Sequence, residues 1–265
     1  METVRKYGKE PYQICLLHGG PGAAGELRTV ALYLSDHFGI LEFLQTEDSV
    51  EGQIEELHCQ LASNADLPAI LVGYSWGAWL GFLFAARYPD LIKKLILVSS
   101  GAFEKRYSQD LMKIRLSRLK PREREEAEKL ISLVNSGHAG NDVLRSLGKL
   151  VAYADSFEYE PGGSDLVNVN LQMYQKVWTE ASRLRDSHEL IDFAVHIKCQ
   201  VVAMHGDYDP HPVDGVEKPL MARLKDFRMI LIRQCGHIPW KEKHAKETFY
   251  EVLGREIQPG AQESG

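Results

Sequence analysis

Short apolar runs alternate with amphipathic stretches along the first hundred residues. The runs are apolar at nearly every position, as in strands that are buried on both faces of a sheet. They cover residues 12–17, 39–44, 68–72 and 91–98. Between them, apolar residues recur at helical spacing over 26–38 and 49–61, and 78–88 is apolar on nearly every side. This alternation predicts an α/β fold with a mostly parallel central sheet and helices on both faces.

The pattern changes after residue 101. Residues 102–197 are charged and helical, without a convincing strand, and strand patterns resume at 199–204 and 227–232 before a last helix at 241–253. A segment of this length is too long for a simple connection. We therefore expect a core formed by 1–101 and 198–265, with 102–197 as a helical cap (lid) inserted before the penultimate strand.

Composition and charge narrow the class of protein. The 265 residues carry a formal net charge of -6, which argues against nucleic acid or an anionic membrane surface as a partner. No apolar run approaches the ~20 residues that cross a bilayer, and the first residues lack the apolar stretch of a secretory signal. Four cysteines without CxxC spacing indicate free thiols. We expect a cytoplasmic protein; the oligomeric state stays open, a homodimer included.

Ser75 is the candidate nucleophile. It is the centre of Gly73-Tyr74-Ser75-Trp76-Gly77, between a predicted strand and an apolar helix. The two glycines allow a sharp turn in which strand and helix approach closely, and the turn lifts the serine above the sheet edge. The N–H of Trp76 then lies at a helix N-terminus, where it can stabilise an oxyanion. The alternative is a tight turn with a solvated serine.

A glycine-rich loop, HGGPG at residues 18–22, follows the first predicted strand. Its glycines let a backbone N–H approach a ligand, and we assign the second oxyanion donor to the N–H of Gly20. A phosphate loop would need a Gly-Lys-[Ser/Thr] ending or G-x-G-x-x-G spacing, and neither is present. We expect His18 to bond the loop rather than to act as a base.

The candidate acid is Asp209, in the HGDYDP sequence that follows the strand at 199–204. Asp207 is the alternative, and either carboxylate could instead cap the turn. The loop after residue 98 offers Ser99 and Ser100 but no carboxylate.

His237 is the candidate base. It follows the strand at 227–232 in the sequence CGH, on a loop that can point an imidazole at the nucleophile. His211 is a second candidate because it lies close to the acid loop. We predict no metal site, since residues such as His205 and His211 on one turn more often bond the backbone than an ion. No cofactor is needed.

The four motifs HGGPG, GYSWG, HGDYDP and CGH, in this order, resemble those of the α/β-hydrolase superfamily across most of the chain. The resemblance implies the α/β-hydrolase fold and a Ser–Asp–His order of the triad. HGGPG, together with the tryptophan after the serine, is most similar to the proline iminopeptidase branch. That branch would imply that acidic cap residues bind a free amine. The candidates are Glu158, Glu160 and Asp165, with a solvated acidic face as the alternative.

Two departures from that branch leave the substrate open. Tyr74 stands where the branch commonly has glycine, and residues 45–48 lack the usual arginine- and glycine-rich turn. The shortness before residue 12 suggests that one or two edge strands are missing. Weak candidates for substrate contact are His18, Tyr74 and Trp178, although aromatic residues at helical spacing are usually core.

The expected function is therefore a serine hydrolase that cleaves a small-molecule ester, thioester or amide through an acyl-enzyme on Ser75. The same residues also fit a cofactor-free lyase or acyltransferase, or a ligand sensor with low turnover.

Overall fold

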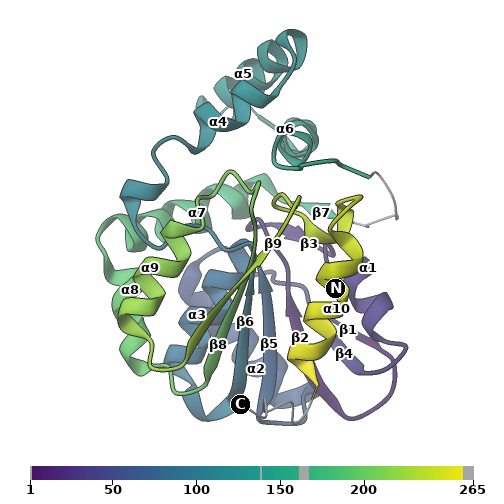
Figure 1. Cartoon of the computed structure of the whole chain (residues 1–265). Helices are drawn as coiled ribbons and strands as arrows, with labels where there is room; N and C mark the ends of the chain where they lie inside the picture. The colour runs from purple at the N-terminus through teal and green to yellow at the C-terminus, as the bar shows by residue number, and fades with distance from the viewer. Residues whose placement is uncertain (1, 138, 161–166, 259–265) are drawn as a thin grey trace.

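A seven-stranded sheet in the order β1-β4-β2-β5-β6-β8-β9 forms the centre of the molecule (Figure 1). The computed structural model describes residues 2–137, 139–160 and 167–258. The strands are β1 (Val4–Tyr7), β2 (Tyr12–Leu17), β4 (Gly39–Phe43), β5 (Ala69–Tyr74), β6 (Ile92–Val98), β8 (Gln200–Gly206) and β9 (Phe227–Ile232). All neighbours pair in parallel except β1 with β4. The expected mostly parallel sheet is confirmed.

Helices cover both faces of this sheet. They are α1 (Arg28–Leu34), α2 (Val50–Asn64), α3 (Trp76–Arg87), α9 (Asp214–Arg223) and α10 (Lys246–Ile257). Side chains of β2 alternate between two cores: Cys15 and Leu17 face the cluster that contains α2, α3 and α9, whereas Ile14 and Leu16 face α1 and α10. This alternation is the period of a strand, so helices on both faces bury the last four residues of β2.

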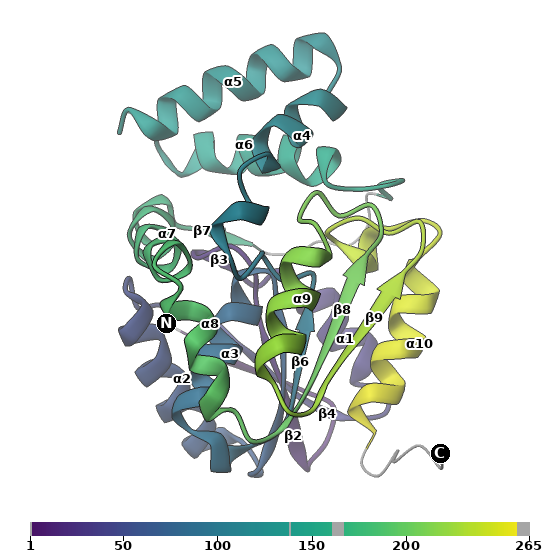
Figure 2. The same cartoon turned by 60° about the vertical axis from the view of Figure 1, so that its left-hand side comes forward.

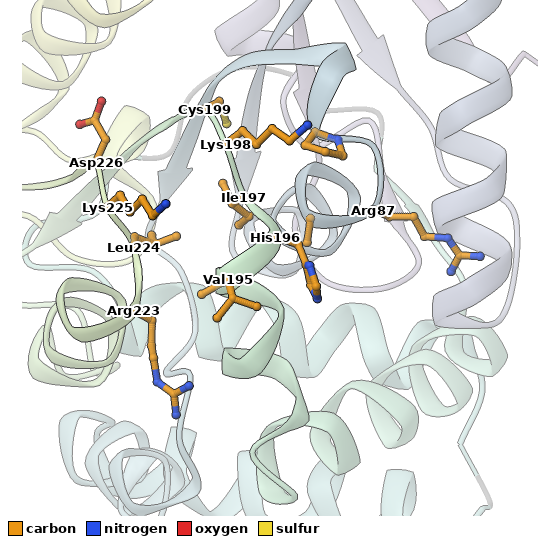
Figure 3. Close-up of a pocket in the computed structure, with 13 residues that line it drawn as sticks. Arg87, Val195, His196, Ile197, Lys198, Cys199, Arg223, Leu224, Lys225 and Asp226 are labelled. Carbon is orange, nitrogen blue, oxygen red and sulfur yellow. The ribbon is translucent and has the colours of Figure 1, made fainter.

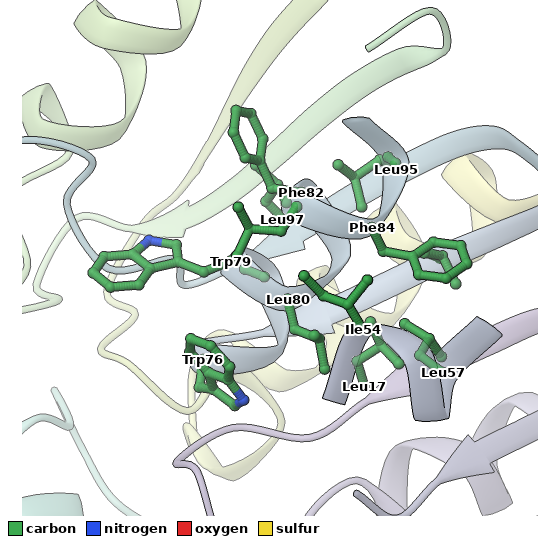
Figure 4. Close-up of a cluster of buried hydrophobic side chains, with 14 of the residues drawn as sticks. Leu17, Ile54, Leu57, Trp76, Trp79, Leu80, Phe82, Phe84, Leu95 and Leu97 are labelled. Carbon is green, nitrogen blue, oxygen red and sulfur yellow. The ribbon is translucent and has the colours of Figure 1, made fainter. Parts of the chain in front are cut away.

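Helix α3 is the most deeply buried helix of the body. Every residue from Trp76 to Ala86 is buried, and Figure 4 shows Trp76, Trp79 and Phe82 among leucines of neighbouring elements. The Trp76 indole donates a hydrogen bond to Gln53 Oε1 (2.9 Å). Since the helix is fixed on all sides, the turn at its N-terminus is fixed as well.

Residues 102–197 contain several helices, some of which lie beyond the carboxyl edge of the sheet (Figures 1 and 2). They are α4 (Leu111–Arg118), α5 (Pro121–Asn135), α6 (Asn141–Ala154), α7 (Leu171–Asp186) and the short α8 (Glu189–Asp192). Helices α4, α5 and α6 stack together above the body, whereas α7 and α8 lie lower, near α2 and α3 (Figure 2). Met173 and Val177 of α7 belong to the main core.

Several expected elements differ from the observed ones. Strand β1 was missed because its sequence, VRKY, is largely polar, as an antiparallel edge strand can be. The expectation of no strand in 102–197 was wrong: Asn168–Val169 (β7) pairs with Ala23–Ala24 (β3), and two residues leave no sequence pattern. Helix α9, which contains Pro219, was also missed.

Two expectations about bonds and membranes can be compared with the described residues. All four cysteines are free. Among the described helices, none has the length and apolar character that a membrane span requires.

Candidate active site

The turn between β5 and α3 holds Ser75 in a strained conformation. Its φ is +51°, which is uncommon for a residue with a side chain, and its N–H donates to Val98 O across the sheet (3.0 Å). A Cβ on Gly73 would lie 2.2 Å from Gly77 O, and a Cβ on Gly77 would lie 2.2 Å from Leu17 O. Both flanking glycines are therefore required by close backbone contacts, as the motif predicts.

Three side chains from separate loops form one chain of hydrogen bonds at the carboxyl edge. His237 Nε2 lies 3.1 Å from Ser75 Oγ, and His237 Nδ1 lies 2.8 Å from Asp209 Oδ2. The other carboxylate of that loop points elsewhere: Asp207 accepts from the backbone N–H of Cys235 (3.3 Å) and pairs with Arg233 (3.6 Å). The imidazole thus meets Asp209 and not Asp207.

The protonation of this chain follows from its environment. Burial alone would raise the pKa of Asp209, but its interactions with His237, His211 and His205, which include the hydrogen bond from His211, hold it well below its usual range. Burial opposes the charge of His237, yet Asp209 outweighs it and raises the pKa of His237. An ionised carboxylate only accepts hydrogen bonds, so His237 carries its proton on Nδ1. Its Nε2 is then free to accept from the Ser75 hydroxyl.

A second imidazole occupies the other oxygen of Asp209. His211 Nδ1 lies 2.8 Å from Asp209 Oδ1, and the backbone N–H of His211 donates to the same oxygen (2.9 Å). His205 Nε2 in turn donates to His211 O (2.8 Å). The only signal in the sequence was that His211 follows the acid by two residues.

Among the described residues, Asp209, His211 and His237 also form a group whose potential metal-ligand atoms lie within 4.8 Å of one another. The Nδ1 atoms of the two histidines each lie 2.8 Å from an oxygen of Asp209 and are therefore already bonded to it. This group differs from the one that the sequence analysis considered, which centred on His205 and His211.

The HGGPG loop packs directly beside the serine turn. His18 is fully buried; its Nδ1 donates to Gly19 O (2.8 Å) and its Nε2 accepts from Gln45 N (3.3 Å). Burial lowers the pKa of His18 to about 4, so the ring is neutral. This is the position of a loop-bonding residue. Gly20 has φ +34°, and a Cβ there would meet only Ala23 Cβ, at 3.4 Å.

The His237 loop is bonded to the end of α6. His237 N donates to Asp155 O (2.9 Å), and the carboxylate of Asp155 receives two nitrogens of Arg115, Nη2 at 2.6 Å and Nε at 2.8 Å. A Cβ on Gly236 would lie 2.0 Å from Asp155 O. Sequence reasoning missed this contact, because nothing in the local pattern connects residues so far apart.

The buried carboxylate of Glu242 holds the same loop through hydrogen bonds to backbone N–H groups. It accepts from the backbone N–H groups of Gly236 (2.8 Å), Phe157 (2.9 Å) and Glu158 (2.9 Å). The segment after α6 and the histidine loop are therefore held as one unit. This residue also gave no sequence signal.

The weaker candidates lie at the edges of this arrangement. Tyr74 is buried, with its ring 5.2 Å from the His237 ring and 4.6 Å from that of Trp240, and burial raises the pKa of its hydroxyl well above the usual value. Trp178, on α7, stacks on Trp79 at 5.7 Å and packs against the main core.

Two of the three acidic residues considered as amine binders already have partners. Glu158 bonds Lys243 and His244, and Glu160 bonds Lys246. Asp165 lies outside the described residues.

A surface hollow of about 700 Å³ lies at the opposite end of the sheet (Figure 3). It is lined by Cys199 and Asp226, which precede β8 and β9, and by Arg87 at the end of α3. Asp209 and His237 follow the same two strands. The hollow is therefore separate from the hydrogen-bonded residues.

The chain is similar in sequence to a known protein family and to one decarboxylase. The sequence model of the α/β-hydrolase fold matches residues 45–243. A cis-3-alkyl-4-alkyloxetan-2-one decarboxylase from Shewanella oneidensis is 30% identical over 104 residues, which is 34% of this chain; the match spans a third of that relative's length.

Solved structures agree in fold over nearly the whole chain. VinJ superposes with a TM-score of 0.71 at 19% identity, covering 96% of this chain and 93% of VinJ. A proline iminopeptidase from Mycobacterium smegmatis gives 0.62 at 17% identity, covering 96% and 93%. A monoacylglycerol lipase from Paleococcus ferrophilus gives 0.62 at 16% identity, covering 97% and 98%. At these identities the likeness concerns the fold alone.

Proposed function

Because this chain belongs to the α/β-hydrolase fold family, we propose that it is a serine hydrolase that cleaves a small ester, thioester or amide through an acyl-enzyme on Ser75. The observation that carries the proposal is the continuous chain from Ser75 Oγ to His237 (3.1 Å) and from His237 to Asp209 (2.8 Å). These are the contacts that a base and its orienting carboxylate require.

The steps follow from the proton positions. His237 Nε2 takes the hydroxyl proton as Ser75 Oγ attacks the substrate carbonyl, and Asp209 stabilises the imidazolium that forms. His237 then gives this proton to the leaving group, which departs and leaves the acyl group on Ser75. A water molecule, deprotonated by His237, attacks the acyl-enzyme and releases the acid, and the proton returns to Ser75.

Two backbone N–H groups are proposed to bind the oxyanion. Trp76 is the first residue of α3, so its N–H lies at the helix N-terminus beside the nucleophile. Gly20 is the other donor. The loop that carries it follows β2, which pairs with β5, and Gly77 packs against Leu17 O and His18 O at the start of that loop. The two donors thus come from neighbouring strand ends.

Residues 102–197 are proposed to act as the cap over this edge. Helix α6 is strongly amphipathic: Leu147 and Leu150 pack against Leu119, Ala127 and Ala154 within the upper helices, and Leu144 and Val151 are half-buried. The partners of Glu158 and Glu160 argue against their use as amine binders, so we favour an esterase over an aminopeptidase.

A cofactor-free lyase is the second candidate. It is favoured by one observation, the local similarity to a decarboxylase from Shewanella oneidensis. A lyase would release CO2 from a strained lactone in a reaction that consumes no water, which distinguishes it from ester hydrolysis.

The proposal is tested with p-nitrophenyl acetate and butyrate against prolyl and alanyl naphthylamides. We expect ester turnover and no release from the amides. Ser75→Ala should lower kcat/KM at least about a thousandfold, since the nucleophile is lost. Ser63→Ala, an exposed serine on α2, is the matched control and should retain full activity. Equal turnover by Ser75→Ala and the parent protein would refute the acyl-enzyme.

A further inference from the structure

The carboxylate of Asp209 receives more hydrogen bonds than a catalytic triad needs. Oδ2 accepts from His237 Nδ1 (2.8 Å), whereas Oδ1 accepts twice from one residue, His211, through its backbone N–H (2.9 Å) and its Nδ1 (2.8 Å). His237 alone would complete the triad. The second imidazole is therefore a feature that the proposed mechanism leaves unused.

We propose that His211 is a positioning residue: its Nδ1–H holds one oxygen of the triad acid so that the other oxygen faces His237. This inference rests on the proposed function, in which Asp209 orients the base. His211 itself is held in place, because its carbonyl accepts from His205 Nε2 (2.8 Å) and its ring lies 4.6 Å from the His237 ring.

The tautomer of His211 follows from its partner. Asp209 only accepts hydrogen bonds, so the proton of a neutral His211 must be on Nδ1, and Nε2 carries the lone pair. Burial lowers the pKa of His211 to about 4, which keeps the ring neutral near pH 7. A neutral donor fixes the carboxylate without placing a second positive charge beside His237. A lysine or arginine there would compete for the charge of Asp209.

Removal of this donor has a defined effect on the base. With one hydrogen bond fewer, the carboxylate attracts the proton of His237 more strongly, so the pKa of His237 should rise. The other groups that face His237 are Asp155, Arg115 and Tyr74; His205 faces Asp209 (3.7 Å), and Glu242 is bonded to the neighbouring Gly236. All of them remain in a variant at position 211, so a shift is assigned to that position.

Two variants distinguish the effect of the His211 hydrogen-bond donor from the effect of the ring's volume. His211→Asn keeps an amide N–H near the place of Nδ1, whereas His211→Leu fills space without a donor. We expect His211→Leu to raise the pKa of His237 by about half a unit to one unit, measured by NMR titration of 15N-labelled histidine. Ester turnover should fall about tenfold in kcat with KM nearly unchanged. His211→Asn should restore both quantities to near the parent values.

A measurement of the tautomer on the parent protein needs no substrate. At pH 7, the 15N spectrum should show His211 protonated on Nδ1 and bare on Nε2, with His211→Asn used for assignment. The opposite tautomer would overturn the proposal, as would an unchanged His237 pKa in folded His211→Leu. If no ester is turned over but the tautomer and the pKa shift are as expected, the proposed function fails and the positioning role stands.

Discussion

The α/β body and the upper helices of residues 102–197 are held together by different kinds of interaction. In α3, every residue from Trp76 to Ala86 is buried. In α4, α5 and α6, all of whose residues are described, the buried positions are Ala127, Val134 and Ala154. The upper segment is tied to the body by polar contacts such as Arg118 Nη2 to Tyr208 O (3.0 Å) and Phe157 N to the carboxylate of Glu242 (2.9 Å).

This difference has a consequence for the site. Ser75 belongs to the densely packed body, where backbone contacts leave it a single conformation. His237 lies on a loop whose backbone is bonded to Asp155 at the end of α6. The position of Ser75, the proposed nucleophile, therefore depends on packing, whereas that of His237, the proposed base, also depends on an ion pair in the upper segment.

The largest expected effect on stability comes from replacing a glycine by alanine in each of the two regions. Gly77→Ala places a Cβ 2.2 Å from Leu17 O, a backbone atom that cannot move aside, so we expect a loss of about 3 kcal/mol or more in the free energy of unfolding. Gly148→Ala in α6 meets no atom within 4 Å and should stabilise the protein by about 0.5 to 1 kcal/mol. Urea unfolding measures both; similar values for the two variants would contradict the comparison.

An intermediate effect is expected at the ion pair. Arg115→Met leaves the carboxylate of Asp155, which is 1% exposed, buried without its partner. Loss of one member of a buried pair costs about 3 kcal/mol, and the double variant with Asp155→Leu should recover part of this loss. If Arg115 also positions the histidine loop, kcat should fall in Arg115→Met. If the losses in unfolding free energy of the two single variants add up in the double variant, Arg115 and Asp155 are not coupled.

The smallest expected effect is the pH dependence of the stability that His18 contributes to the α/β body. The pKa of His18 is about 4 when the protein is folded, so the unfolded chain binds more protons between about pH 6.5 and pH 4. Its contribution is therefore complete above pH 6.5 and is lost as the pH falls. His18→Asn is expected to be less stable at pH 7, with a gap to the parent that closes towards pH 4. Parallel stability curves in urea would show that the ring is not buried in its neutral form.

The same contrast explains what the sequence could predict. Strands β2 and β9 were predicted with their bounds from their apolar runs, although the last four residues of β2 are buried whereas β9, at the sheet edge, is mostly half-buried. The turn at Ser75 was predicted because Gly73 and Gly77 are needed for local backbone contacts. In both cases the physical cause lies within a few residues of the pattern.

Other features depend on residues far apart and leave no local pattern. The bond from His237 N to Asp155 O joins two loops, and Glu242 binds three N–H groups on either side of it. His211 was considered as a base, but the direction of its ring towards Asp209 depends on the folded loop and on His205. The residues that support a site are thus harder to predict than those that react.

The central claim, that Ser75 is the activated nucleophile, is tested most directly by covalent capture. The protein is treated with a fluorophosphonate and digested, and the modified peptide is identified by mass spectrometry. We expect a single adduct on Ser75, formed much more slowly in His237→Gln and not at all in Ser75→Ala. An adduct on another residue, or equal labelling of Ser75 without His237, would contradict it.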